Sequence, residues 1–296
     1  MNVFGGTQER TAAVRRGKRG PAGEPGSIKD LCQWLPRVVT KNLREISQVG
    51  SFIIKDLSRD IEKKNVKDVN TWISRNTDAK ENLVSDENKR VGKYFPLDSG
   101  YYAITLEKSG YNNDDIFFLS PYTPGYFCIT FRTLRQENQV LISNYINPEK
   151  PSQEIQVSRN GIVILMSYNS TILRFPIEHN CKDWTTLFIS NYIVNHSRPK
   201  MIYECTVNGK FCRSFKLKTS DDEREGICLG SRWKEPYIYF DGDVACIDFH
   251  QSSLSDQSEN LPECLRDLII KNQMKIVEGS EKNYKKQGLY KEEISR

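Results

Sequence analysis

Long apolar runs, zinc-binding motifs and familiar catalytic motifs are all missing from this 296-residue sequence. No stretch approaches the roughly 18 apolar residues that a membrane-spanning helix needs, so we expect no membrane span. There is no C-x-x-C pair and there are only three histidines, which argues against a zinc framework. The G-x-S-x-G and HExxH signatures are absent as well. What remains is a chain with 10% aromatic residues, long enough to bury one large β-sandwich core.

Positive charge is scarce in the middle of the chain and concentrated at its two ends. The formal net charge is +5, of which residues 1–20 contribute +4 and residues 271–296 contribute +3. The middle of the chain is therefore nearly neutral. A dedicated nucleic-acid-binding fold would carry its basic stripe on the folded surface, so we expect no specific nucleic-acid partner.

The 8 cysteines include one pair placed symmetrically about an Asn-Gly turn at residues 208–209. Asn-Gly between two strand-like arms is the strongest short hairpin signal. A two-residue turn would set Cys205 opposite Cys212, and opposed Cα atoms lie about 4.5–5.5 Å apart, within disulfide reach. We predict a Cys205–Cys212 disulfide, with two buried free thiols as the alternative. Cys228–Cys264 is the next candidate pair, and the even count favours an oxidising compartment.

Two glycosylation sequons, at Asn169 and Asn195, fit a secreted glycoprotein. The N-terminus, which reads Met-Asn-Val-Phe-Gly-Gly, has no apolar segment of the kind found in signal peptides. An extracellular location therefore implies that the start of this chain is incomplete. The alternative is that the protein is not exported.

Glycine recurs at every third position near the N-terminus, at Gly17, Gly20, Gly23 and Gly26. Collagen needs this period because only glycine fits at the crowded axis of its triple helix. Three triplets are too few to hold a triple helix alone. The stretch is therefore either the end of a collagen-like stalk or a flexible Gly/Pro linker, and residues 1–26 are predicted to form a disordered basic tail.

A helical neck is predicted over residues 27–65. Ser27-Ile-Lys-Asp30 resembles a capping box, and the apolar residues that follow have helical spacing. Such a neck after collagen-like triplets would align three chains, which suggests a homotrimer. The alternative is that the neck docks on the sandwich of its own chain.

Strands dominate the predicted domain over residues 69–278. About a dozen strand-like segments are separated by turn signals roughly every 8–12 residues, as β-sandwiches require. Alternation is clear in Phe127-Cys-Ile129-Thr-Phe131, which predicts a strand with one buried face. Pro262 followed by an apolar stripe predicts a short C-terminal helix, and the Lys/Glu-rich residues 279–296 are predicted to be a disordered tail.

The run from Cys205 to Phe249 resembles one section of laminin G, pentraxin and other concanavalin-A-like domains. In those families an Asn-Gly-Lys hairpin and a Leu-Gly strand precede a core strand with the pattern F-x-G-x-[IVL]-x-x-[VI]-x-[IFV]. The residues that match this pattern are Phe240, Gly242, Val244, Ile247 and Phe249. The resemblance covers about residues 70–255. It implies a mainly β protein, a concanavalin-A-like antiparallel β-sandwich or jelly roll, which binds rather than catalyses.

No catalytic site is expected. Glycosidases that retain configuration need two carboxylates about 5–5.5 Å apart. In this fold an E-x-D-x-x-E strand supplies them, and that spacing does not occur here. Related domains often hold calcium at the sandwich rim. Residues 112–115 and the pair Asp241/Asp243 are oxygen-rich, but no family ligand motif maps onto either, so we assign no cofactor and leave calcium unassigned. The three histidines are interpreted as surface or rim residues: His179, His196 and His250.

These features predict an extracellular matrix or cell-surface adhesion protein whose non-catalytic sandwich recognises a glycan or a protein ligand. Recognition would use the sandwich loops or the concave face, and trimerisation would add avidity. Two other hypotheses stay open, a glycosidase-like enzyme with unrecognised carboxylates and an intracellular interaction module. Counting free thiols under denaturing, non-reducing conditions separates the intracellular hypothesis from the extracellular one.

Overall fold

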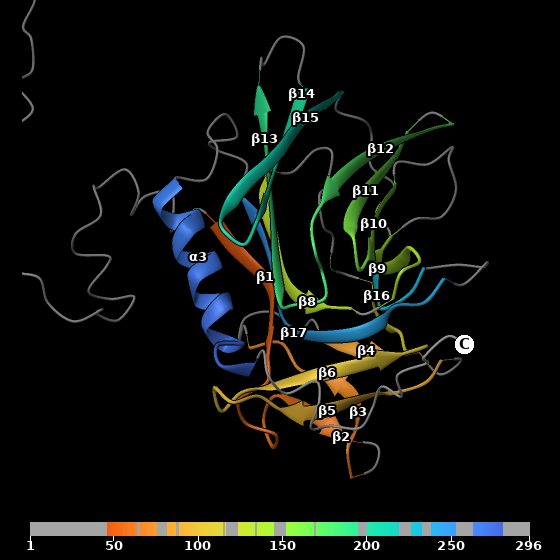
Figure 1. Cartoon of the computed structure of the whole chain (residues 1–296), viewed down its shortest axis with the longest axis vertical. Helices are drawn as coiled ribbons and strands as arrows, with labels where there is room; N and C mark the ends of the chain where they lie inside the picture. Colours follow the sequence, from red (N-terminus) through yellow and green to blue (C-terminus); the bar gives the residue numbers. More distant parts are fainter. Residues whose placement is uncertain are drawn as a thin grey trace, which may run out of the picture. The chain divides into compact units, whose positions relative to one another are not determined.

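The structure is a computed structural model that describes residues 46–280 with several gaps, all within one compact unit, Asn42–Arg296. The gaps are residues 64–65, 76–81, 87–88, 115, 117–123, 134, 145–151, 169, 195–199, 219–225, 233–237 and 253–262. The described part is almost entirely antiparallel β-structure with one helix, α3 (Figure 1). The mainly β sandwich predicted from the sequence is confirmed.

Seventeen strands and the helix follow one another along the described chain. They are β1 (Ile46–Ile53), β2 (Ile61–Lys63), β3 (Asp68–Trp72), β4 (Leu83–Ser85), β5 (Gly92–Pro96), β6 (Tyr102–Glu107), β7 (Tyr111–Asn113), β8 (Gly125–Arg132), β9 (Gln139–Ser143), β10 (Ser152–Ser158), β11 (Gly161–Tyr168), β12 (Thr171–Glu178), β13 (Thr185–Val194), β14 (Lys200–Val207), β15 (Lys210–Lys218), β16 (Ile227–Leu229), β17 (Asp241–Ser252) and α3 (Glu263–Ile276).

One layer of the sandwich, called sheet A here, is built around β17. The second half of β17 lies between β1 and β8, and its first half pairs with β6. The sheet continues from β8 to β13, β14 and β15. Strand β1 lies at the start of the described chain and β17 near its end, so the pairing of these two strands joins distant parts of the chain within sheet A.

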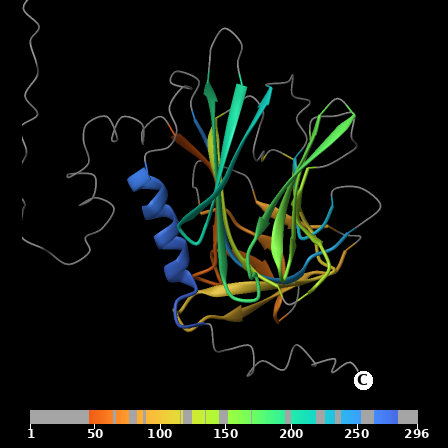
Figure 2. The same ribbon diagram turned by 45° about the horizontal axis from the view of Figure 1, so that its top comes forward.

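The other layer, called sheet B here, runs in the order β12, β11, β10, β9, β16, β7, β4, β3. Figure 2 shows the strands β10–β12 of this layer standing apart from β13–β15 of sheet A. Strand β5 pairs with both β3 and β6, so it joins the two layers at one end of the sandwich.

The core lies between the inner faces of the two layers. On β8, Phe127, Ile129 and Phe131 are fully or almost fully buried and belong to one apolar cluster with the inner residues of both sheets. The rings of Phe127 and Phe249 lie 5.3 Å apart on neighbouring strands. Burying each such side chain contributes about 1.5–3 kcal/mol. The prediction that this strand buries only one face is wrong, because the alternate residues on its other face are buried as well.

The free edges of the two layers meet at β12 and β15, which have no strand pairing with each other among the described residues. Side chains close this seam. The rings of Phe175 and Phe215 stack with centroids 3.8 Å apart, and an Nη of Arg213 donates a hydrogen bond to the carbonyl oxygen of Pro176 at 2.8 Å. Proline is tolerated there because its missing N–H belongs to the side of β12 that faces away from β11.

Helix α3 covers the outer face of sheet A and contacts β13, β8 and β17. The predicted C-terminal helix is thereby confirmed. Ile270 packs with Tyr126, Cys128 and Phe188 on the strands beneath it. None of the helices among the described residues is long and apolar enough to cross a membrane.

The prediction of a helical neck over residues 27–65 is wrong from Ile46 onwards. Ile46–Ile53 is strand β1, and Ile61–Lys63 is strand β2. The spacing of Phe52, Leu57 and Ile61 imitates a helix, but pairing with β17 satisfies the backbone of β1 in an extended conformation. Residues 27–45 of the predicted neck lie outside the described residues, as do the tail 1–26 and residues 281–296 of the predicted tail 279–296. The start of that tail is wrongly predicted, because Ser280 is buried and accepts a hydrogen bond from the Asp98 N–H at 2.9 Å.

The predicted Asn-Gly hairpin forms, but the predicted Cys205–Cys212 disulfide is wrong. Asn208 and Gly209 both have positive φ, as the tight hairpin turn requires. A β-bulge then inserts Cys212 as an extra residue, so Cys205 lies opposite Arg213. Cys205 is buried and Cys212 is exposed, and both are free thiols.

Candidate ligand-binding site beside the C-terminal helix

A cavity of about 410 Å³ opens on the outer face of sheet A, between α3 and the strands β1, β8 and β17. We call it the polar pocket. Its lining residues come from six separate parts of the chain: Ser51, Ile53, Arg75, Tyr101, Tyr126, Asp248, His250, Ile269, Asn272, Gln273, Lys275 and Ile276. Its size and mixed lining suit a ligand the size of a small molecule or of one or two sugar rings.

One wall of the polar pocket is a pair of stacked rings. Tyr126 and His250 are directly opposite each other on β8 and β17, and their ring centroids lie 4.1 Å apart at an interplanar angle of 17°. Phe188 stacks on Tyr126 as well, at 5.3 Å. The aromatic wall is therefore held on two sides by rigid strands, which keeps its orientation fixed.

The floor of the pocket is a hydrogen-bonded carboxylate. Asp248 accepts hydrogen bonds from the Ser51 hydroxyl and from the Gln273 amide, both at 2.7 Å. Burial raises the pKa of the Asp248 carboxyl above its ordinary value, and these two hydrogen bonds oppose that rise. Gln273 also accepts a hydrogen bond from the Thr130 hydroxyl at 3.0 Å, so the amide that orients Asp248 is itself fixed.

His250 supplies the unusual feature of the site. Its Nδ1 atom is buried and has no hydrogen-bond partner among the described residues. Burial lowers the pKa of His250 to about 3, so the ring is neutral at physiological pH. A buried polar atom without a partner is rare in proteins, and a bound molecule is one of the arrangements that satisfies it.

Donor groups surround the rim of the pocket. Arg75 is partly exposed and pairs with Asp60 through its Nε at 3.1 Å. Asn272 and Lys275 project from the exposed side of α3, and Tyr101 lies between sheet A and the helix end. The arrangement has hydrogen-bond acceptors and an aromatic wall inside and mostly donors outside. It suits a hydroxyl-rich ligand, because a hydroxyl both donates and accepts.

The structure places few of the sequence-predicted site residues at this pocket. The sequons at Asn169 and Asn195 and the glycines Gly17, Gly20, Gly23 and Gly26 all lie outside the described residues, so glycosylation and the collagen-like segment stay predictions. Cys228 is buried beside Lys89 and Cys264 is exposed on α3. Both are free thiols, so the candidate Cys228–Cys264 pair is not formed.

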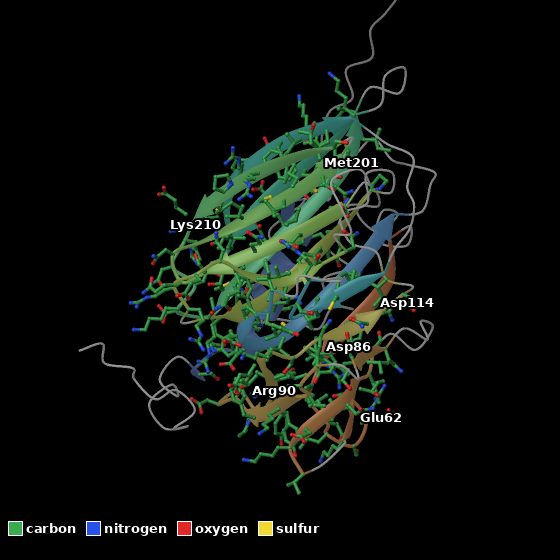
Figure 3. The ribbon with its side chains drawn as sticks, turned by 90° about the vertical axis from the view of Figure 1, so that its right-hand side faces the viewer. Glu62, Asp86, Arg90, Asp114, Met201 and Lys210 are labelled. Atoms are coloured by element: carbon green, nitrogen blue, oxygen red, sulfur yellow. The ribbon has the colours of Figure 1, made fainter. Side chains whose placement is uncertain are left out.

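The two oxygen-rich stretches lie away from the pocket. Asp243 is buried and binds Arg132 through Oδ2 at 2.8 Å, while Asp241 pairs with Arg135 at 3.0 Å. Asp114 follows β7 and is exposed, on the part of the molecule where Figure 3 labels it with Asp86. The described residues contain no cluster of three His, Cys, Asp or Glu side chains that would hold a metal ion. Calcium binding stays untested.

Sequence reasoning missed most of the pocket. Of its residues only His250 had been singled out, as a rim histidine, and it does line the pocket. Ser51, Arg75 and Asn272 carry no local motif, and they meet only because β1 pairs with β17 and α3 packs over both. Ser51 lies inside the stretch misread as a helix, so no pattern in the sequence would have placed it beside Asp248.

Comparison with known proteins gives the fold but no family. No family model matches the chain, and no curated protein matches it. Among solved structures, the binding domain of botulinum neurotoxin DC in complex with SialylT is similar, with a TM-score of 0.50 and 11% identity over 77% of this chain and 51% of that one. A structure described as showing that cell entry of botulinum neurotoxin type C depends on interaction with two ganglioside molecules gives a TM-score of 0.51, 11% identity and coverage of 77% and 51%.

A third similar structure is the binding domain of botulinum neurotoxin DC in complex with rat synaptotagmin II, with a TM-score of 0.51, 11% identity and coverage of 77% and 52%. The chain spans about half the length of these binding domains. At such low identity the likeness establishes the β-sandwich fold and nothing finer.

Proposed function

We propose that this protein is a non-catalytic binding module and that its polar pocket recognises a glycan. The observation that carries the proposal is a cavity lined by hydrogen-bonding groups from β1, β17 and α3, among them the Asp248 carboxylate and His250, whose buried Nδ1 has no partner among the described residues. A sugar presents several hydroxyls, each of which can donate to the acceptors and accept from the donors of this pocket.

The similar structures support a binding role in general terms. They include complexes with SialylT and with rat synaptotagmin II, and a neurotoxin that interacts with two ganglioside molecules. They therefore include ligands of both classes that the sequence predicted, a glycan and a protein. The polar pocket favours the glycan, because its lining is rich in hydrogen-bonding groups and its volume is too small for a protein surface.

We further propose that the module works outside the cell, on a matrix or cell-surface glycan. The two sequons and the even cysteine count support this location. The exposed free thiols of Cys212 and Cys264 favour the competing intracellular module. Mass spectrometry of protein secreted from cells separates the two, because an extracellular protein would carry glycan on Asn169 or Asn195.

A glycan array tests the pocket, with wild type compared to three single variants. Asn272→Ala and His250→Ala each remove one polar group of the pocket, while Lys271→Ala changes the residue just before Asn272 on α3, which does not line the pocket. Losing one hydrogen bond costs about 0.5–1.5 kcal/mol, so we expect each pocket variant to weaken binding roughly 2- to 10-fold. The control variant Lys271→Ala should bind as wild type does.

Two results would reject this function. The first is a folded wild-type protein that binds no glycan on a broad array. The second is glycan binding that both pocket variants leave unchanged. Release of a hydrolysed product from the bound glycan would instead support the glycosidase-like hypothesis.

A further inference from the structure

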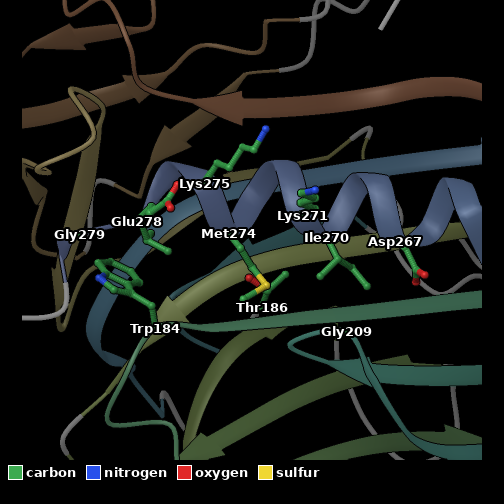
Figure 4. A pocket seen from close by; sticks show the side chains of 11 residues that line it. Trp184, Thr186, Gly209, Asp267, Ile270, Lys271, Met274, Lys275, Glu278 and Gly279 are labelled. Atoms are coloured by element: carbon green, nitrogen blue, oxygen red, sulfur yellow. The ribbon is translucent and has the colours of Figure 1, made fainter. Parts of the chain in front are cut away.

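A second cavity, of about 540 Å³, lies along the opposite flank of α3 from the polar pocket. We call it the apolar groove. Thr186 of β13 forms its floor, Ile270 and Met274 of α3 form one wall, and the hairpin tip at Gly209 forms the other. Figure 4 shows Met274 and Ile270 pointing from the helix toward the strand, with Trp184 at the end of the groove beside Glu278.

The lining of the groove is more apolar than that of the polar pocket. Trp184, Ile270, Met274 and Val277 all contribute side chains to it. Met274 is 40% exposed, and Phe211, two residues beyond Gly209 on the hairpin, is 59% exposed. These are two of the few large apolar side chains that the described part of the chain leaves open to solvent, and Met274 lies in the groove itself.

The rim of the groove carries two ammonium groups without an ion-pair partner among the described residues. Lys271 and Lys275 are one turn apart on α3, and both line the groove. Like charges at this spacing repel each other by a few tenths of a kcal/mol, and an anion between them would relieve the repulsion. Of the two carboxylates on the rim, Asp267 is paired with Arg266 at 3.2 Å, which leaves Glu278 as the opposing charge.

The indole of Trp184 closes one end of the groove with an apolar ring. The residue is 8% exposed, and its Nε1–H has no hydrogen-bond acceptor among the described residues. The ring is held in place by the Arg132 guanidinium, whose carbon lies 4.4 Å from the ring centroid. Two unpaired cations beside an apolar channel are complementary to one kind of ligand, a molecule with an apolar body and an anionic head.

We propose that the apolar groove binds a free single-chain amphiphile, with the apolar chain along Ile270, Met274 and Trp184 and an anionic head at Lys271 and Lys275. This site is separate from the polar pocket, although Lys275 borders both. Lys271 borders only the groove, which makes it the residue that distinguishes the two.

The test measures decanoate binding to the full chain by calorimetry, below the micelle concentration, and by the rise in unfolding temperature that a ligand of the folded state produces. Three variants change exposed side chains: Lys271→Gln removes a rim charge, Met274→Glu places a carboxylate in the groove, and Lys216→Gln removes a charge on β15 that does not line it. We expect decanoate to bind wild type and Lys216→Gln alike. Binding should fall about 3- to 10-fold in Lys271→Gln and more in Met274→Glu.

Several outcomes would overturn the proposal. They are no binding of decanoate to wild type, equal binding by Lys271→Gln and wild type, equal affinity for decanol and decanoate, or binding only to vesicles of anionic phospholipid. The glycan affinity of Lys271→Gln should match that of wild type whatever decanoate does, so failure of the groove and failure of the polar pocket are distinguishable.

Discussion

Replacing Asp243 by Asn should be among the most destabilising single changes in the sandwich. Asp243 and Arg132 face each other on β17 and β8, and their side chains are only 3% and 2% exposed. The carboxylate binds the Arg132 Nε at 2.8 Å and accepts the Thr105 hydroxyl at 2.7 Å. Asn preserves the shape and one acceptor but leaves the guanidinium charge buried without a counter-charge.

The expected magnitude follows from that asymmetry. Removing one partner of a buried ion pair costs about 3–5 kcal/mol, a large part of the roughly 5–15 kcal/mol that stabilises an ordinary domain. Arg132 cannot shed its proton, and its stacking on Trp184 and Phe95 keeps it in place. In urea the unfolding midpoint should therefore fall by on the order of 1 M or more.

Two companion variants sharpen the test. Arg132→Met should cost less than Asp243→Asn, because burial already raises the pKa of the Asp243 carboxyl and the group can take up a proton. Arg135→Gln breaks the neighbouring pair with Asp241, whose arginine is 52% exposed, and should cost less than about 1 kcal/mol. The reasoning is refuted if urea unfolding shows Asp243→Asn to be no more destabilising than Arg135→Gln.

Three further predictions concern titration, thiols and packing. Between about pH 3 and 6.5, His250 should make the unfolding free energy rise by up to about 1.4 kcal/mol per pH unit. Its folded-state pKa of about 3 lies below the unfolded value, so in this range only the unfolded chain binds the proton. Urea titrations at several pH values should show a flatter slope for His250→Gln, and an unchanged slope would contradict the burial of the ring. In a Cys32→Ser background, two thiols should react quickly with a thiol reagent, Cys212 and Cys264, while the buried ones should react only on unfolding; fast labelling of a third would show that a buried thiol is accessible. Gly242→Ala should destabilise the protein by about 1–3 kcal/mol, since the new Cβ would lie 2.4 Å from the Arg132 carbonyl oxygen; thermal unfolding at the wild-type temperature would show this expectation to be mistaken.

The sequence predicted those parts of the fold that have a strong local signal. The alternation around Phe127 predicted β8, the Asn-Gly pair predicted the β14–β15 hairpin, and Pro262 with the apolar stripe after it predicted α3. Each of these signals lies within a few consecutive residues, so it can be read without knowing which distant segments the element packs against. The resemblance to concanavalin-A-like domains added the sandwich arrangement that local patterns do not contain.

The parts of the structure that the sequence did not predict depend on pairing between segments that are distant in the chain. Strands β2, β4, β7 and β16 have three residues each, too few for any periodicity to show. The sequence places Cys205 and Cys212 symmetrically about the turn and gives no sign of a β-bulge. The bulge shifts the register, so that Arg213 and not Cys212 lies opposite Cys205. The polar pocket brings together residues that are far apart in the sequence, such as Ser51 and Asp248, so it forms only when β1 pairs with β17.

The central place of β17 has a consequence for how the protein is made. Strands β1, β6 and β8 all hydrogen-bond to it, and it is the last strand of the described chain. Until the ribosome has synthesised β17, these three strands lack their common neighbour and keep apolar faces open to water. Folding of the sandwich must therefore wait until β17 has left the ribosome, and a nascent chain stalled before β17 is a natural client for chaperones.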